Sequence, residues 1–147
     1  MNRKVILTIA TILWMIFIFL FSSQEANESS KLSDSFIDKT VINVYKVFDS
    51  DLTQSKEHSI KEMLVTPIRK LAHLSVYLVL GILVYLTLTE YKIKKVVIYA
   101  IIICISYAIS DEFHQLFVKG RSGEIRDVII DTLGSSIGII LINRKRK

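Results

Sequence analysis

The chain has 147 residues, of which 51% are hydrophobic and 22% charged, and its mean hydropathy is +0.44. Such a hydropathy is high for a soluble domain of this length, and it predicts a single membrane domain covering residues 1–147. The net charge of +5 does not indicate a nucleic-acid partner, because many basic residues lie beside apolar segments. The single cysteine, Cys104, excludes an internal disulfide framework and a cysteine-rich metal site.

Four apolar runs predict four membrane-spanning helices. A span needs about 20 residues to cross a hydrocarbon core of roughly 30 Å. Extended into their polar flanks, the spans cover residues 5–23, 69–88, 96–116 and 124–142. The first resembles a signal peptide, but its apolar stretch is long for one and no small-x-small cleavage site follows it. We therefore expect an uncleaved helix and an all-α, integral membrane four-helix bundle.

The basic residues predict the orientation of these spans. They predominate in three short segments, at residues 3–4, 89–95 and 144–147, where Glu90 is the one acidic residue. The positive-inside rule places such segments in the cytoplasm. Both termini are therefore expected to be cytoplasmic, with the loop 24–68 and the link between the last two spans outside. The basic tail is thus interpreted as a topology signal.

The outer loop 24–68 is too long for a passive connector. Its apolar residues recur at steps of three and four, as in an amphipathic helix; they are Leu32, Phe36, Ile37, Val41, Val44, Tyr45 and Phe48. Ser29 or Ser30 would cap this helix, which would lie on the outer membrane surface or cover the mouth of the bundle. A second helix is expected to start near Ser59, and Pro67 to break or restart the chain before the second span.

Polar residues form three stripes at the outer ends of the last three spans. Residues four apart share one helix face, and the three stripes are Arg69, His73 and Tyr77; Asp111 and Gln115, with His114 beside them; and Asp127, Asp131 and Ser135. Ionisable groups within a membrane are costly, so they usually point inward, at one another or at a ligand. The predicted topology puts the stripes at one depth, which indicates an outward-facing polar site.

The link between the last two spans contains Gly120 and Gly123 beside basic residues. Its turn would present the N-terminal N–H groups of the next helix to the outside, and Lys119, Arg121 and Arg126 would complete an anion site. An ordinary reverse turn with solvated bases is the alternative. Gly134 and Gly138 have the spacing that permits close helix approach, which we expect inside the bundle and not in a homodimer.

Three segments that contain these residues resemble the VanZ-like family of membrane proteins. Residues 69–77, RKLAHLSVY, resemble its R-K-x-A-H-x-x-x-Y signature, and residues 111–121, DEFHQLFVKGR, its D-E-x-H-Q-x-F-x-x-G-R signature. Residues 126–134 continue the match. The family often has proline where Lys119 stands. The resemblance implies a small multi-pass protein of the bacterial inner or plasma membrane, in a family named for a member tied to teicoplanin resistance. It implies no settled reaction.

The first functional hypothesis is a binding or envelope-modifying role. The outer site would bind a lipid or cell-wall precursor headgroup and so alter glycopeptide access. Basic residues would hold the anion, and polar residues would position it; the full binding set is Arg69, Tyr77, Glu112, Gln115, Lys119, Arg121, Arg126, Asp127 and Asp131. The bilayer itself is the other expected partner, and no nucleic acid is expected.

The alternative is a hydrolase or transferase that acts on a lipid-linked substrate. His114 or His73 would be the general acid or base, oriented by Asp111 or Asp131. Ser110 and Ser135 are candidate nucleophiles by proximity alone. A second alternative is a purely structural polar network, although buried ion pairs of that kind need not stabilise a protein. A homo-oligomeric carrier is a further possibility.

A metal version of the site would use His73, His114, Asp111 and Glu112 as ligands. Glu112 and His114 are two residues apart, which on a helix points them in different directions, and no H-E-x-x-H motif is present. We therefore expect no metal site, and the sequence identifies no cofactor.

Overall fold

The structure is a computed structural model that describes residues 2–42 and 53–146. Within these residues every regular element is a helix and no strand occurs, so the all-α prediction is confirmed. The elements are α1 (Arg3–Ser22), α2 (Ala26–Ile37), the π-helical segment η1 (Asp38–Ile42), α4 (Gln54–Glu90), α5 (Val96–Gln115) and α6 (Ile125–Lys145).

Three of the described helices, α1, α4 and α5, are long and apolar enough to cross a membrane. Their most apolar stretches have mean hydropathies of 2.6, 2.1 and 1.8, and at most 33% of each stretch is buried inside the protein. Large apolar side chains such as Leu13, Leu20 and Ile102 are exposed, as lipid contact requires. Helix α6 is not among the three. Any 18-residue stretch of it contains Asp131 and at least two further charged residues.

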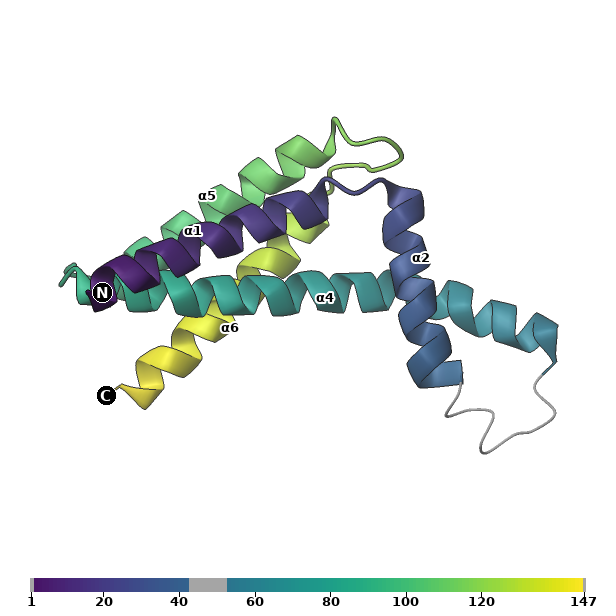
Figure 1. The fold of residues 1–147 in the computed structure, drawn as a ribbon, viewed down its shortest axis with the longest axis horizontal. Coiled ribbons are helices and arrows are strands. Elements are labelled where there is room, and N and C mark those ends of the chain that lie inside the picture. The colour runs from purple at the N-terminus through teal and green to yellow at the C-terminus, as the bar shows by residue number, and fades with distance from the viewer. Residues whose placement is uncertain (1, 43–52, 147) are drawn as a thin grey trace.

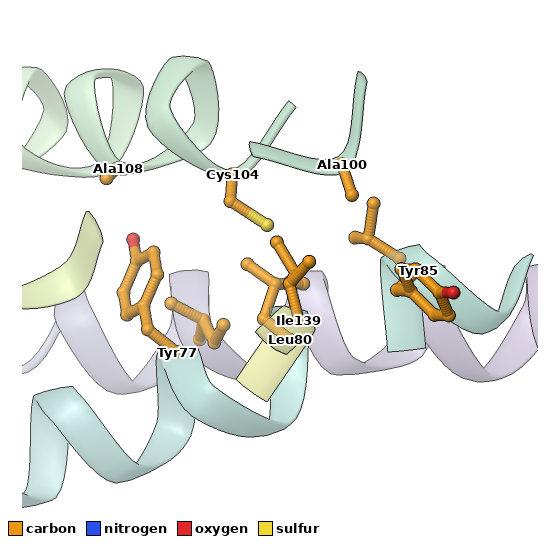
Figure 2. Close-up of a cluster of buried hydrophobic side chains, with 9 residues drawn as sticks. Tyr77, Leu80, Tyr85, Ala100, Cys104, Ala108 and Ile139 are labelled. Carbon is orange, nitrogen blue, oxygen red and sulfur yellow. The ribbon is translucent and has the colours of Figure 1, made fainter. Parts of the chain in front are cut away.

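Helices α4, α5 and α6 pack around a core built from large residues on one side and small residues on the other (Figure 2). Ala100, Cys104 and Ala108 are four residues apart, so they lie on one face of α5. All three are fully buried. This flat face lets α5 approach the bulky side chains of Tyr77 and Leu80 on α4.

Helices α4 and α6 cross in close contact (Figure 1), and glycines make this possible. A Cβ atom at Gly134 would overlap the carbonyl oxygen of Leu74, and one at Gly138 would overlap that of Leu78. Gly81 of α4 packs in the same manner against Ser135 of α6. The predicted use of Gly134 and Gly138 for packing within the chain is confirmed.

Helix α4 runs unbroken through Pro67, contrary to the predicted break. The helix also begins at Gln54, with Thr53 as its N-cap residue, and not near Ser59. A proline inside a helix removes one backbone hydrogen bond and costs roughly 3 kcal/mol. Long helical stretches on both sides and the packing of α2 against this helix offset that local loss.

The outer-loop helix starts earlier than its sequence pattern indicates. It begins at Ala26, so Ser29 and Ser30 lie inside it and neither is its N-cap. Just before this helix, the Arg121 side chain donates a hydrogen bond from Nε to the Gln24 carbonyl oxygen at 2.9 Å. Ile37 and Ile42 are buried. The predicted apolar positions Val44, Tyr45 and Phe48 lie outside the described residues.

An ion-pair cluster holds this segment against the start of α4, which α2 crosses (Figure 1). Lys61 Nζ lies 2.6 Å from Asp38 Oδ1 and 3.2 Å from Glu57 Oε1. Whether the segment lies on a membrane surface or acts as a cover stays a prediction.

Both described chain ends lie at one end of the molecule (Figure 1). The turn after α4 lies there too, because Arg3 forms an ion pair with Glu90 at 3.2 Å and Thr8 contacts the Tyr91 hydroxyl at 3.2 Å. The α1–α2 turn and the α5–α6 link lie at the opposite end. The described parts of the three basic segments therefore lie at one end, and the polar stripes lie toward the other.

Candidate functional site

The polar site lies where α4, α5 and α6 converge with the end of α1. Each helix contributes buried polar side chains to it: Ser22 from α1, Tyr77 from α4, Asp111, Glu112 and Gln115 from α5, and Asp131 and Ser135 from α6. The three sequence stripes thus face one another, which helix periodicity alone left open.

Asp111 is held from two neighbouring helices. Its Oδ2 atom accepts hydrogen bonds from Ser22 Oγ at 2.9 Å and from the Tyr77 hydroxyl at 3.2 Å. The carboxylate is 2% exposed, and its Oδ1 atom has no hydrogen-bond partner among the described residues. One oxygen is therefore fixed in place, while the other remains available for a further interaction.

Asp131 is fully buried beside His73. The closest approach is 3.7 Å between His73 Nδ1 and Asp131 Oδ1, which is longer than a hydrogen bond. Neither carboxylate oxygen of Asp131 has a hydrogen-bond partner within the described part of the chain. Ser135, the next residue of the α6 stripe, donates its hydroxyl to the Thr132 carbonyl oxygen at 3.0 Å. Nothing in this arrangement activates Ser135 as a nucleophile.

A second network connects α5 to the α5–α6 link. Gln115 Nε2 donates to Glu112 Oε1 at 3.0 Å, and the Glu124 backbone N–H donates to Glu112 Oε2 at 3.0 Å. Arg121 Nη1 donates to Gln115 Oε1 at 3.0 Å. Glu112 therefore binds the backbone of Glu124, the residue that precedes α6. Gln115 connects Glu112 to Arg121 through hydrogen bonds at both ends of its amide group.

Arg121 is the central basic residue of this end of the molecule. Its Nε and Nη1 atoms have the partners described above, while its buried Nη2 atom has none among the described residues. Burial, and then the charge of Arg69, lower the pKa of Arg121 below its ordinary value. An arginine nevertheless stays protonated in proteins, so a fixed cation with one unpaired donor group stands here.

A small polar pocket opens beside Arg121. It is lined by Arg69, His73, Gln115, Gly120, Arg121, Ser122, Glu124 and Asp127. Gly120 has a φ of 77°, a left-handed conformation in which a side chain would be strained. Lys70 Nζ lies 3.1 Å from Asp127 and 3.9 Å from Glu124, so both acidic residues of the lining have a cationic partner.

An apolar cavity of about 330 Å³ adjoins the polar pocket. It lies between the end of α1, α2 and α4, and its lining is Phe21, Ser33, Phe36, Ile68, Arg69, Leu71, Ala72 and Ser75. Arg69 lines both spaces. One basic side chain therefore stands between a polar compartment and an apolar one.

Several predicted site residues lie elsewhere. Lys119 and Arg126 are exposed and do not line the polar pocket. His114 packs its ring against Phe19, with 4.3 Å between centroids, and its Nε2 atom contacts Ser23 Oγ at 3.1 Å. Ser110 is exposed and donates to the Tyr107 carbonyl oxygen of its own helix. His73 is therefore the histidine that meets both the pocket and a buried aspartate.

Sequence reasoning missed four participants, namely Ser22, Gln24, Lys70 and Glu124. Ser22 and Gln24 follow the first apolar run, a position where polar residues are ordinary. Lys70 lies next to Arg69 but not on the helix face of the stripe formed by Arg69, His73 and Tyr77. Lys70 is the second residue of the 69–77 signature, which is the signal that could have found it, whereas contacts between helices are what distinguish the other three from solvated neighbours.

The structure also groups possible metal ligands differently from the set considered from sequence. His73, Asp111 and Asp131 each offer one ligand atom, and these atoms lie within 4.8 Å of one another. Of the earlier set, His114 and Glu112 instead have the partners given above.

Comparison with known proteins places the chain in a family. No curated protein and no solved structure matches it. The VanZ/LLP1 family matches residues 7–146, which is essentially the whole chain and includes every residue of the polar site. The resemblance drawn from the sequence signatures is thereby confirmed, and the chain belongs to the VanZ/LLP1 family.

Proposed function

We propose that this membrane protein binds the anionic headgroup of a lipid or of a lipid-linked cell-wall precursor in the polar pocket. The observation that carries the proposal is Arg121, whose buried Nη2 group is unpaired among the described residues at the edge of this pocket. Its other two nitrogens are anchored to Gln24 and Gln115, so the guanidinium is oriented before a ligand arrives. Phosphate and carboxylate groups match such a donor.

The charges around the pocket favour an anion. Arg69 and Arg121 line it, and Lys70 neutralises part of the charge of Asp127 and Glu124. Within the lining, Arg69 and Arg121 face Glu124 and Asp127, and Lys70, which is outside the lining, pairs with both acidic residues. Gly120 contributes backbone without a side chain to the lining.

The neighbouring apolar cavity favours a lipid over a free anion. A lipid carries hydrocarbon directly beside its charged headgroup, and Arg69 lies at the border between the two cavities. Phe21, Phe36 and Leu71 offer an apolar surface to a chain that leaves the polar pocket.

In this proposal α6 is the fourth span of a multi-pass protein in the bacterial inner or plasma membrane. The basic segments around Arg3, Lys92 and Arg144 would lie in the cytoplasm. The polar pocket would then open toward the outer leaflet. Binding a cell-wall precursor headgroup there would alter its access to glycopeptides, which is how we propose a link to teicoplanin resistance.

A hydrolase or transferase acting on the same lipid class is the second candidate. It is favoured by the approach of His73, which lines the pocket that would hold the headgroup, to the buried Asp131. A purely structural network is the third candidate. It predicts that Asp111→Asn lowers thermal stability and function together, whereas loss of function at unchanged stability contradicts it.

Native mass spectrometry of the full chain in nanodiscs tests the binding proposal. Nanodiscs containing phosphatidylglycerol and an undecaprenyl phosphate-type lipid should yield protein that retains an anionic lipid. Arg121→Ala should lose it, and Arg144→Ala at the far end of α6 should keep it. Arg126→Ala distinguishes the anion site predicted from the sequence, which includes Arg126, from the pocket in the structure, which the exposed Arg126 side chain does not line. Wild type without an enriched lipid, or Arg121→Ala with unchanged retention, would contradict the proposal.

Measuring the lipid inventory separates binding from catalysis. If the second candidate holds, overexpression of the wild type changes lipid or precursor composition, and a folded His73→Ala variant does not. An unchanged inventory argues for binding alone.

A further inference from the structure

Three side chains converge from three different helices, one of them in the lining of the polar pocket and two buried behind it. His73 comes from α4, Asp111 from α5 and Asp131 from α6, and one ligand atom of each lies within 4.8 Å of the others. Asp131 and Asp111 are 0% and 2% exposed, and the His73 side chain is 11% exposed. Helix packing therefore brings together an imidazole and two carboxylates, far apart in sequence, in an interior position.

The two carboxylates of this group have oxygen atoms without hydrogen-bond partners among the described residues. Asp111 Oδ1 and both oxygens of Asp131 are buried without hydrogen-bond partners among the described residues. Buried polar atoms of this kind are rare, because leaving them unpaired costs free energy. Two adjacent carboxylates also repel each other unless a cation or a proton compensates them.

The neighbouring lysine and arginine side chains do not compensate the charge of these two carboxylates. Lys70 forms ion pairs with Asp127 and Glu124, and Arg121 bonds to Gln24 and Gln115. In the described part of the chain, His73 is the one basic side chain within ion-pair distance of Asp131. The acidic pair thus lacks the lysine or arginine that a structural ion-pair network would supply.

We propose that His73, Asp111 and Asp131 bind a divalent first-row transition metal ion. An imidazole with two carboxylates suits Zn²⁺ or Mn²⁺, whereas Mg²⁺ and Ca²⁺ prefer oxygen ligands throughout. Ligand bonds of about 2.0–2.2 Å allow two ligand atoms to be at most about 4.4 Å apart. The observed grouping within 4.8 Å therefore needs only small side-chain adjustments.

The surroundings support this assignment. Ser22 and Tyr77 both donate to Asp111 Oδ2, which leaves Oδ1 for the metal, and such outer hydrogen bonds typically orient metal ligands. His73 also lines the polar pocket, so the metal site adjoins it. The inference requires only these side chains and goes beyond the proposed headgroup function.

Metal content of the full chain, purified in detergent without added lipid, is the direct test. Chelator-treated protein is incubated with Zn²⁺ or with Mn²⁺, desalted, and analysed by mass spectrometry of the metal. We expect about one ion per wild-type chain and at least about a 10-fold weaker affinity for Asp131→Asn. Glu62→Gln is the matched control, because it removes a carboxylate from the exposed His58–Glu62 pair. Wild-type protein that takes up neither ion, or Asp131→Asn with unchanged affinity, overturns the proposal.

A second measurement needs no variant of the buried aspartates. Pulsed electron paramagnetic resonance of Mn²⁺ bound to wild-type protein should reveal coupling to a histidine nitrogen. The coupling should persist in His58→Ala and His114→Ala and disappear in His73→Gln. Bound Mn²⁺ without nitrogen coupling, or coupling lost only with His58 or His114, overturns the assignment of His73. Because no lipid is present, failure here is distinct from failure of the headgroup proposal.

Discussion

Tyr77 of α4 donates a buried hydrogen bond to Asp111 of α5 at 3.2 Å, on the same oxygen that Ser22 of α1 reaches at 2.9 Å. One carboxylate thus connects three helices at the end of the molecule where the family signatures meet. It also leaves Asp111 Oδ1 facing the interior without a partner among the described residues. The polar site therefore links three helices through hydrogen bonds and is also a candidate binding site.

Tyr77→Phe should destabilise the protein by about 0.5–1.5 kcal/mol, because a buried donor to Asp111 is lost. Thermal unfolding in detergent measures this. Tyr85→Phe is the control, since it removes a similar hydrogen bond to Asn143 at 2.9 Å, away from the site. Both variants should lose stability, but only Tyr77→Phe should weaken metal binding, by about 10-fold. Equal metal affinity in both would contradict this role of Tyr77.

Gly134→Ala should separate α4 from α6, because the added Cβ overlaps the Leu74 carbonyl oxygen. Alanine has the better helix propensity, yet overpacking should dominate and cost about 1–3 kcal/mol. Unfolding by heat in detergent measures the loss. Leu133→Ala, at an exposed position of the same helix, should change stability much less. A Gly134→Ala variant as stable as wild type would show that the helices can move apart without cost.

Lys61→Met should loosen α2, because Lys61 bridges to Asp38 at 2.6 Å and to Glu57 on α4. Hydrogen exchange of the α2 amides is the measurement, and faster exchange is the expected result. Lys56→Met is the control, because Lys56 is an exposed lysine on α4, the helix that also carries Lys61. Unchanged exchange in Lys61→Met would mean that apolar contacts such as those of Ile37 hold the segment without the ion pairs.

The proposed orientation predicts which introduced cysteines a membrane-impermeant maleimide reaches in intact cells. In a Cys104→Ser background, Ser122→Cys should be labelled from outside, and Tyr91→Cys only after the membrane is opened. Both positions are exposed, so access to the reagent distinguishes them. The reverse pattern would invert the topology and place the polar pocket on the cytoplasmic side.

Tertiary structure overruled local signals at several positions. Pro67 is a strong local breaker, but α4 continues through it because the chain is helical on both sides and α2 packs against this helix. Serine is a preferred capping residue, yet α2 begins at Ala26, ahead of Ser29, just after Gln24, whose carbonyl oxygen accepts a hydrogen bond from Arg121. Lys119 and Arg126 belong to the predicted anion site by position alone, and both are exposed.

Amino-acid composition and residue spacing were enough to predict the helical class, the apolar helices and the polar stripes. Each follows from composition or from the 3.6-residue period, which places His73 and Tyr77 on one face. Composition and spacing could not determine which faces meet, since that depends on contacts between residues far apart in the chain. Gly134 and Gly138 let α6 approach α4 closely, and Asp131 thereby comes within 3.7 Å of His73. Only that packing turned three separate stripes into one buried group beside a pocket.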